Sequence, residues 1–417
     1  MYPSLVRYVG FPAIEDMIIQ LAICAIFIAY YANNKVLYIK SKKVKILNKC
    51  FIILFLIILI SSLINFNNFF AIGKSIVTFY FSFIFIFYII LTIRLNEREI
   101  CKLLQLIFIM ILIQLPIVII QFIFDGGIDS DSISGTMSQS SSGGTGILII
   151  LITIISGYAS VRLLFTGFTT KYFVLYFSTF IPVFTSDVRV GYFFIPFVFV
   201  LVFIYRNISY KKQRVSSILP LLITLIGLNI SISYLVNDLS INYQHNKSTR
   251  TLITDMDNLL NYTGYYADNK RLGIFRAIYR DMQSPVNLLF GHGPSSIITS
   301  KLLNKEIIKY NTHNSSMKTM AKYFTSLGLI GVFILLYIFK VIMSLTMDYI
   351  KLENNLSLIQ IAISFLIYCI IFILSTIYAP VWNTQSGIVL FLMAGLISNR
   401  YQYLESNHQI LNTGSAP

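Results

Sequence analysis

Long apolar runs dominate this sequence and limit what it can fold into. About eleven runs, most of them near the ~20 residues that cross a bilayer as a helix, are separated by polar connections. Inside a bilayer every backbone polar group needs an internal partner, which a helix supplies. Hydrophobic residues make up 56% of the chain and charged residues only 12%, which excludes a soluble enzyme or a nucleic-acid module. The sequence therefore predicts an all-α polytopic integral membrane protein.

The predicted spans differ in length, and the sixth and seventh are short enough to imply tilt or kinking. Their ranges are 13–31, 50–65, 71–93, 103–124, 147–165, 172–185, 190–205, 216–235, 323–345, 356–377 and 388–398. They divide the chain into three parts: spans one to eight in 1–235, a long polar segment in 236–322, and the last three spans with a polar tail in 323–417.

Basic residues predict how these spans are oriented. Lys and Arg total 32 against 17 Asp and Glu, a formal net charge of +15. Of the 32, 18 fall in connections on one side, three in short connections on the other side, and 11 in the long polar segment. Short cytoplasmic loops are enriched in Lys and Arg. We therefore expect the N-terminus outside and the C-terminus in the cytoplasm, and the charge excess does not indicate nucleic acid.

The span interiors carry few groups that could do chemistry. They are nearly devoid of ionisable residues, which an ion-coupled carrier would usually need. The four cysteines, Cys24, Cys50, Cys101 and Cys369, lie in or beside apolar runs, so we expect neither disulfides nor a thiolate metal site. A functional site is therefore expected in the outer connections.

Three outer connections could contribute to such a site. The segment 236–322 is the largest extramembrane piece and carries a charge excess of +5. The loop 125–146 is rich in Ser and Gly, and a tight turn, SDVRVG, occupies 186–191 between two spans. We expect the large segment to hold most of the functional residues.

An amphipathic helix is predicted at 269–282. At 100° per residue, Arg271 shares a face with Leu272, Phe275, Ile278, Tyr279 and Met282. A cation at the edge of an apolar face is costly unless an anion meets it, which favours a functional role for Arg271 over snorkelling of its side chain. Arg276 and Arg280 lie four residues apart on the opposite face, where either solvent or an anionic substrate would meet them.

A glycine-rich turn follows at 288–296, with the sequence LLFGHGPSS. Gly291 and Gly293 permit a close backbone approach, and Pro294 can start a short helix. Backbone N–H groups in such a turn can donate hydrogen bonds to phosphate oxygens, although a plain tight turn explains the pattern equally well. His292 is either a surface turn residue or a ligand or base.

The segment 311–332 predicts a helix that begins at the outer surface and continues inward as a span. His313 and Asn314 fall in its first turn, beside N–H groups and the positive end of the helix dipole, where anions bind. The dipole and neighbouring cations disfavour a protonated His313 and leave its imidazole able to accept a proton. The alternative is a histidine that merely caps the span.

These pieces, in this order, resemble the bacterial O-antigen polymerase and O-antigen ligase superfamily. The resemblance is carried by R-L-x-I-aromatic at 271–275, L-F-G-x-G-P at 289–294, H-N at 313–314 and G-x-x-G at 328–331. The turn at 186–191 is similar to the family's S-R-x-x turn with one residue inserted. Gly135 and Thr136 resemble its earlier G-T-F loop, with Met137 in place of the aromatic residue. The motif-bearing part covers roughly 135–332.

The resemblance implies a fold and a substrate class. The fold would be glycosyltransferase C-like, with one large helical periplasmic loop, in the bacterial inner membrane. The substrate would be an oligosaccharide on undecaprenyl pyrophosphate, transferred without metal, nucleotide sugar or other cofactor. Besides the lipid bilayer, a chain-length regulator protein is an implied partner.

The same resemblance suggests roles for individual residues. Arg189 and Arg271 would bind the pyrophosphate, because a planar guanidinium binds phosphate oxygens in pairs. His313 would position or deprotonate the acceptor hydroxyl, and Asp187 would either act as that base or pair with Arg189. The remaining candidate substrate-binding residues are Asn314, Gly291, Gly293, Arg276 and Arg280. No paired carboxylates of the retaining-glycosidase kind are evident, so we expect inversion at the anomeric carbon.

Three functions remain open. The leading hypothesis is a polymerase that joins lipid-linked repeat units of an O antigen or capsule. The second is a ligase that passes the finished glycan to a lipid A core. The third is a flippase or other transporter of lipid-linked oligosaccharides, which the uncharged span interiors disfavour.

Overall fold

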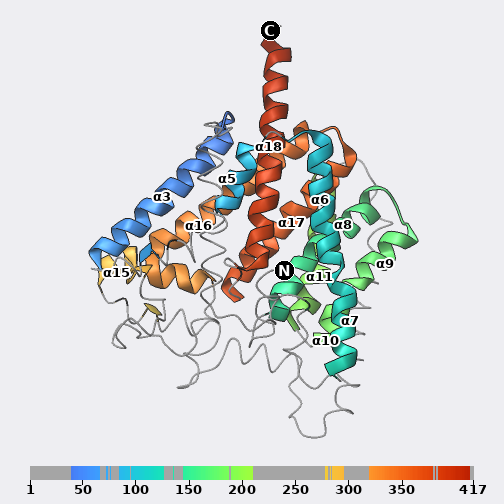
Figure 1. Cartoon of the computed structure of the whole chain (residues 1–417), viewed down its shortest axis with the longest axis horizontal. Coiled ribbons are helices and arrows are strands. Elements are labelled where there is room, and N and C mark those ends of the chain that lie inside the picture. Colours follow the sequence, from blue (N-terminus) through green and yellow to red (C-terminus); the bar gives the residue numbers. More distant parts are fainter. Residues whose placement is uncertain are drawn as a thin grey trace.

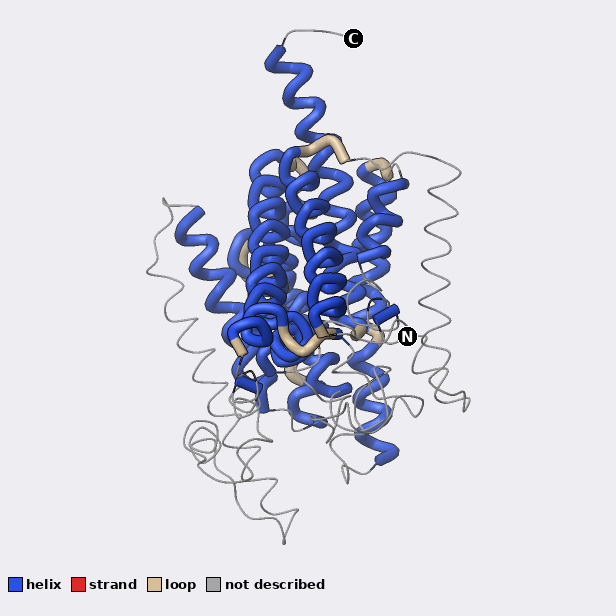
Figure 2. Tube along the Cα trace, turned by 90° about the vertical axis from the view of Figure 1, so that its left-hand side faces the viewer, coloured by secondary structure: helices blue, strands red, loops and turns tan. Residues whose placement is uncertain are grey.

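Every element in the described part of the chain is a helix. The structure, a computed structural model, describes residues 39–65, 72–73, 76, 84–93, 95–125, 135, 144–186, 189–209, 278–279, 282, 284–294, 319–378, 381 and 384–413. Long helices run side by side in a bundle, and the end of the last helix projects beyond it (Figure 1, Figure 2).

The helices fall into an N-terminal group, a short helix near the middle of the sequence, and a C-terminal group. The N-terminal group comprises α3 (Lys42–Ile64), α5 (Ile84–Thr92), α6 (Glu97–Leu112), α7 (Gln114–Asp125), α8 (Gly144–Phe165), α9 (Thr170–Ser178), α10 (Ile181–Ser186) and α11 (Arg189–Ser209). The short helix is α15 (Pro285–Phe290), and the last group comprises α16 (Thr319–Leu352), α17 (Leu356–Tyr378) and α18 (Gln385–Thr413).

Within the described residues, six helical stretches are long and apolar enough to cross a membrane. They are Lys42–Ile64, Glu97–Phe124, Gly144–Phe165, Val190–Ser209, Thr319–Leu352 and Leu356–Ile377. Each coincides with one of the predicted runs, so the prediction of a helical membrane protein is confirmed at this level. The total of eleven spans and the glycosyltransferase C-like fold stay predictions. The predicted spans 13–31 and 216–235 lie outside the described residues.

Two predicted spans differ in form from the expectation. The run 172–185 is two short helices, α9 and α10, because Pro182 has no N–H and its ring clashes with the carbonyl four residues earlier, which is where α9 ends. The run 388–398 is the first part of the much longer α18, whose polar second half continues beyond the bundle (Figure 1). A hydropathy pattern detects the apolar core of such an element and misses its polar extension.

Helix α8 is the most deeply buried of the six candidate spans and packs against α17, α11 and α9. Before its last turn, which holds Arg162, α8 carries mostly apolar or small side chains on every face, as expected for a helix surrounded by other helices. At Gly157 a Cβ would lie 3.5 Å from Ser364 Cα, in ordinary van der Waals contact, so small residues face each other where α8 meets α17.

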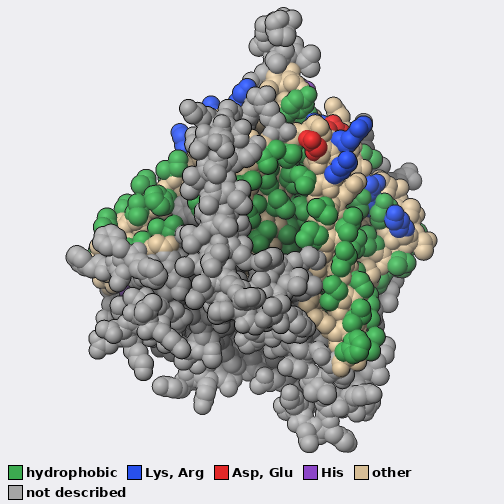
Figure 3. All heavy atoms as spheres, in the orientation of Figure 1, with side chains coloured by type: hydrophobic (Ala, Val, Ile, Leu, Met, Phe, Trp, Pro, Cys, Tyr) green, Lys and Arg blue, Asp and Glu red, His purple; other side chains and the backbone are tan. Residues whose placement is uncertain are grey.

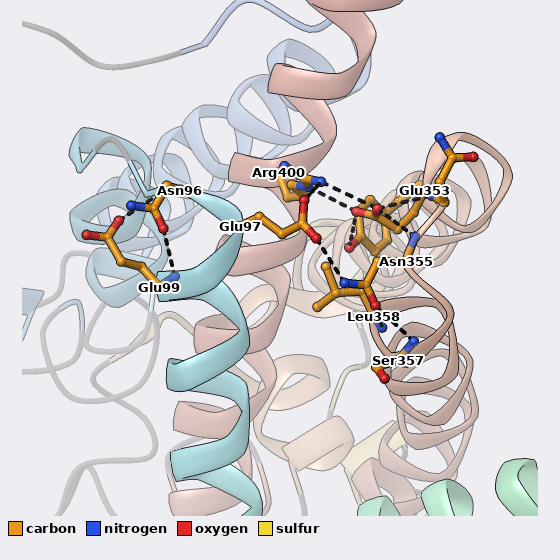
Figure 4. A network of polar contacts seen from close by, with 10 residues as sticks. Asn96, Glu97, Glu99, Glu353, Asn355, Ser357, Leu358 and Arg400 are labelled. Carbon is orange, nitrogen blue, oxygen red and sulfur yellow. Dashed lines mark hydrogen bonds and ion pairs between the residues drawn. The ribbon is translucent and has the colours of Figure 1, made fainter.

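An ion-pair network joins α6, α18 and the connection between α16 and α17 (Figure 4). The Arg400 guanidinium donates to Glu97 Oε2 at 2.6 Å and to Glu353 Oε2 at 2.9 Å. Asn355 donates to Glu97, and the Tyr349 hydroxyl donates to Glu353. A buried charge needs such partners, so this network joins the ends of α6, α16 and α17 to the middle of α18.

Basic residues that the sequence assigns to one side lie at one end of the bundle. Lys43 of α3 pairs with Asp348 near the end of α16, and Arg162 of α8 reaches the Ser357 hydroxyl at the start of α17, near the Arg400 network. Figure 3 shows Lys and Arg side chains gathered along this edge above an apolar surface. The alternation of the eleven spans and the cytoplasmic location of this end stay predictions.

Candidate functional site

The glycine-rich turn is preceded by the short helix α15, which the sequence analysis did not identify. The Ser284 side chain caps it by accepting a hydrogen bond from the Asn287 N–H at 3.0 Å, and Pro285 occupies its first turn. The helix ends at Gly291, whose φ of +72° suits glycine because it has no Cβ. The chain then turns through His292 and Gly293.

This turn docks on the broken part of α16. At Gly328 the φ of +64° interrupts the helix, so the carbonyls of the preceding turn need donors from elsewhere. The His292 N–H donates to the Thr325 carbonyl at 2.8 Å, and the Gly293 N–H donates to the Ser326 carbonyl at 3.1 Å. Non-helical backbone within a membrane protein is tolerated where other protein groups satisfy it, and the turn supplies that function here.

The two backbones meet at a pair of glycines. A Cβ added to Gly291 would lie 2.5 Å from the Ser326 carbonyl carbon, and one added to Gly328 would lie 2.4 Å from the Leu289 oxygen. Both distances are far inside van der Waals contact. The L-F-G-x-G-P and G-x-x-G patterns, distant in sequence, therefore form one structural unit, which we call the turn–kink junction (residues 289–293 with 325–328).

Helix α3 completes the junction with two polar residues at its end. The Ser61 hydroxyl lies 2.6 Å from the Phe290 carbonyl oxygen and 2.9 Å from the Ser326 carbonyl oxygen, and it can donate to either. Asn65 donates one N–H to the Gly291 carbonyl at 3.1 Å and the other to the Ser61 carbonyl at 2.8 Å. These contacts join α3, α15 and α16 where their ends meet, at the lower left of Figure 1.

A buried lysine lies one helical turn from these carbonyls. Lys322 of α16 is only 7% exposed, and its carbonyl accepts a hydrogen bond from the Ser326 hydroxyl at 2.6 Å. The sequence analysis counted Lys322 only as the last basic residue of the large outer segment. Burial of a cation is costly, and such residues in membrane proteins are commonly functional. Lys322 is therefore a candidate functional residue one helical turn from the junction.

The end of the predicted amphipathic helix packs beside the junction. Ile278 and Met282 are buried and form a small apolar cluster with Ala321 and Phe324 of α16, as expected for the apolar face. Tyr279, which the sequence analysis placed on the same face, is 61% exposed. Its position 100° from Ile278 puts it at the edge of the face, and a phenol tolerates contact with water there.

Between the end of α7 at Asp125 and the start of α8 at Gly144, the Ser/Gly loop is described at Gly135 alone. The Gly135 N–H donates to Gln121 Oε1, and the Gly135 carbonyl accepts from Gln121 Nε2, both at 2.8 Å. The amide of one α7 side chain therefore satisfies both backbone polar groups of Gly135. A Cβ at Gly135 would lie 2.7 Å from Gln114 Oε1. The φ of +63° at Gly135 favours glycine in the G-T pair.

Most of the predicted site residues fall outside the described structure. Gly291 and Gly293 are described and lie in the turn–kink junction. Arg189 is the first residue of α11, and its side chain is outside the described part. The residues outside the described ranges are Arg271, Arg276, Arg280, His313, Asn314 and Asp187. The structure therefore joins two of the predicted pieces and leaves the arrangement of the charged residues as a prediction.

Sequence reasoning missed Ser61, Asn65 and Lys322 as parts of this site. The available signal was polarity near the end of an apolar run: Ser61 and Ser62 are followed closely by Asn65. In membrane helices such residues often bond across helix interfaces. Which partner they bond could not be inferred, because that depends on contacts more than 200 residues apart in sequence.

Comparison with known proteins assigns no family. The chain matches no protein-family model, and no curated protein is significantly similar to it.

Proposed function

We propose that this protein is a polymerase that joins undecaprenyl-pyrophosphate-linked oligosaccharide units of an O antigen or capsule at the outer face of the bacterial inner membrane. The observation that carries the proposal is the turn–kink junction. Two glycine patterns of the resemblance meet there, backbone to backbone, one helical turn from the buried Lys322. An anionic head group at the end of a membrane helix is the kind of substrate that such surroundings favour.

The chemistry is an inverting transfer without a metal. An acceptor hydroxyl attacks the anomeric carbon of the donor glycan, the new glycosidic bond forms, and the bond to the pyrophosphate oxygen breaks. His313 takes the hydroxyl proton, while Asp187 serves as an alternative base or as the partner of Arg189. Negative charge that builds on the leaving pyrophosphate is stabilised by Arg189 and Arg271, which lowers the barrier only if they are positioned before reaction.

The other candidate residues support binding. Asn314 adds polar contacts beside His313, and Arg276 and Arg280 extend the cationic surface toward the glycan. Gly291 allows the turn to approach α16 closely, and the Gly293 N–H donates to the Ser326 carbonyl of α16. In this scheme the C-terminus is cytoplasmic and a chain-length regulator acts as partner.

Alanine variants in cells lacking the native gene test the proposal. Arg189→Ala, Arg271→Ala and His313→Ala are each expected to abolish the ladder of polymerised glycan on a gel while membrane levels of the protein stay normal. Lys351→Ala is the matched control, because Lys351 is 76% exposed at the other end of the bundle. A normal ladder from all three variants would refute the assignment of these residues.

A further inference from the structure

The corner between α8 and α9 brings two cations around one aromatic ring. Arg162 is in the last turn of α8 and Lys171 in the first turn of α9, and Gly167, with φ +95°, helps reverse the chain between them. The Arg162 guanidinium carbon lies 5.5 Å from the centre of the Tyr172 ring, and Lys171 Nζ lies 5.9 Å from the same centre. Two like charges on one ring repel each other unless an anion lies close by.

The Arg162 side chain is held in one orientation. Its Nε donates to the Tyr158 hydroxyl at 3.0 Å, and its guanidinium carbon lies 5.3 Å from the centre of the Tyr158 ring. A second nitrogen, Nη2, reaches the Ser357 hydroxyl at 3.5 Å. These contacts restrict the guanidinium before any ligand arrives, which lowers the entropy cost of binding one.

Among the described residues, no carboxylate forms an ion pair with either of these cations. In the part of the chain that the structure describes, ion pairs join Lys43, Lys351 and Arg400 to acids, and none includes Arg162 or Lys171. Glu97 is connected to this corner through Asn355, which donates to Glu97 Oε1 and accepts from the Ser357 N–H. Glu97 Oε2 already accepts from Arg400. The corner therefore presents a net positive charge.

The corner lies at the end of an apolar belt. Phe168 in the connection is 64% exposed and Val174 on α9 is 58% exposed, while α8 itself is a candidate membrane span. Figure 3 shows Lys and Arg side chains above apolar surface at this edge. Aromatic and basic residues together at the end of a span are typical of contact with lipid head groups.

We propose that Arg162 and Lys171 bind the phosphate of an anionic phospholipid. The guanidinium and the ammonium each donate to the phosphodiester oxygens, the Ser357 hydroxyl adds a donor, and the acyl chains lie along Phe168 and Val174. A zwitterionic lipid binds less well, because its own ammonium competes with Lys171 for the phosphate.

Native mass spectrometry of the purified, delipidated full-length chain tests this. Wild type is expected to retain phosphatidylglycerol at least about tenfold more tightly than phosphatidylcholine, and Arg162→Gln with Lys171→Gln is expected to remove that preference. The matched control is Lys102→Gln with Lys351→Gln, which removes the same charge from two exposed lysines and keeps the preference. Lys171→Gln alone is expected to lose part of the preference for phosphatidylglycerol. Because Lys171 is exposed, this loss is not explained by a folding defect.

Three outcomes would overturn the proposal. One is equal retention of the two lipids by wild type. Another is an unchanged preference in the double variant. The third is displacement of phosphatidylglycerol by millimolar inorganic phosphate, which would indicate a site for free phosphate instead of a lipid. Arg162→Lys keeps the charge but loses the planar donor fork, and it is expected to fall between wild type and Arg162→Gln.

Discussion

Gly291 and Gly328 face each other so closely that a Cβ on either one would lie 2.7 Å from the backbone nitrogen of the other. Gly291 ends α15 and Gly328 breaks α16, and both have positive φ angles. The contact lets the turn at His292 and Gly293 donate two backbone hydrogen bonds to the broken helix. One close approach thus explains why glycine occurs in two separate parts of the sequence.

Gly328→Ala is expected to destabilise the protein. The backbone conformation at Gly328, with φ +64° and ψ −159°, costs an L-residue about 1–3 kcal/mol, and overlap with the Leu289 carbonyl adds to this. The measurement is the midpoint of thermal unfolding in detergent, which is expected to be lower for Gly328→Ala than for wild type. Gly146→Ala in α8 is the matched control, because an added Cβ there has no neighbour within 4 Å. Equal midpoints for the two variants would contradict the close contact.

Ser61→Ala should cost more than Ser62→Ala, although both serines are buried in α3. The Ser61 hydroxyl bonds to carbonyls of α15 and α16, whereas the Ser62 hydroxyl bonds to Ile58 within its own helix. Loss of the Ser61 bonds is expected to lower stability by about 1 kcal/mol and to shorten the glycan product. Unfolding midpoints and glycan gels for the two variants measure the difference; identical behaviour would show that Ser61 does not hold the junction.

Arg400→Ala should be among the most destabilising single changes at its end of the bundle. It leaves Glu353, whose side chain is 2% exposed, without its guanidinium, a loss of about 3–5 kcal/mol for a buried pair. Lys351→Ala removes an exposed partner of Asp348 and should cost at most about 1 kcal/mol. Denaturation in detergent compares the two, and a loss for Arg400→Ala no greater than that of the control would mean that the network contributes little.

Acid should weaken the same network. Burial is the strongest single influence on the pKa of Glu353 and raises it. Hydrogen bonds from Arg400 and from the Asn355 N–H, together with the Arg400 charge, outweigh burial and hold this pKa below its ordinary value of 4.5. A carboxyl with a lowered pKa stabilises the folded state above its unfolded pKa and loses that contribution as the pH falls through the folded value. Glu353→Gln should therefore flatten the loss of stability below about pH 4.5; parallel stability curves for variant and wild type would argue against this.

The membrane helices were predictable because length and apolarity suffice to identify them. The runs that became α8 and α17 are nearly uniform in hydropathy, so their ends were placed within a few residues. The span within α16 was predicted to start at Tyr323, four residues after the first described residue of the helix, because the buried Lys322 lowers the local hydropathy. The helix itself was predicted to begin at 311–312, which lies outside the described residues. Burial of polar groups depends on what packs around them, which hydropathy does not report.

The turn–kink junction was only partly predictable. The glycines at 291 and 293 indicated close backbone approach, but the approach could not be assigned to Gly328, because a G-x-x-G pattern inside an apolar run also fits an unbroken helix. The Arg400 network could not be predicted, because Arg400 and Glu97 are 303 residues apart in sequence. In the sequence, Arg400 counts only as one of the basic residues that predict the orientation of the spans.

Reconstitution with a single substrate measures the central claim most directly. Purified protein in lipid vesicles is given undecaprenyl-pyrophosphate-linked repeat units alone, with no lipid A core and no nucleotide sugar. The proposed polymerase lengthens the glycan on the lipid carrier and releases one undecaprenyl pyrophosphate for each bond formed, and Arg271→Ala does not. No lengthening without lipid A core, but transfer once core is added, would contradict the polymerase and identify a ligase instead.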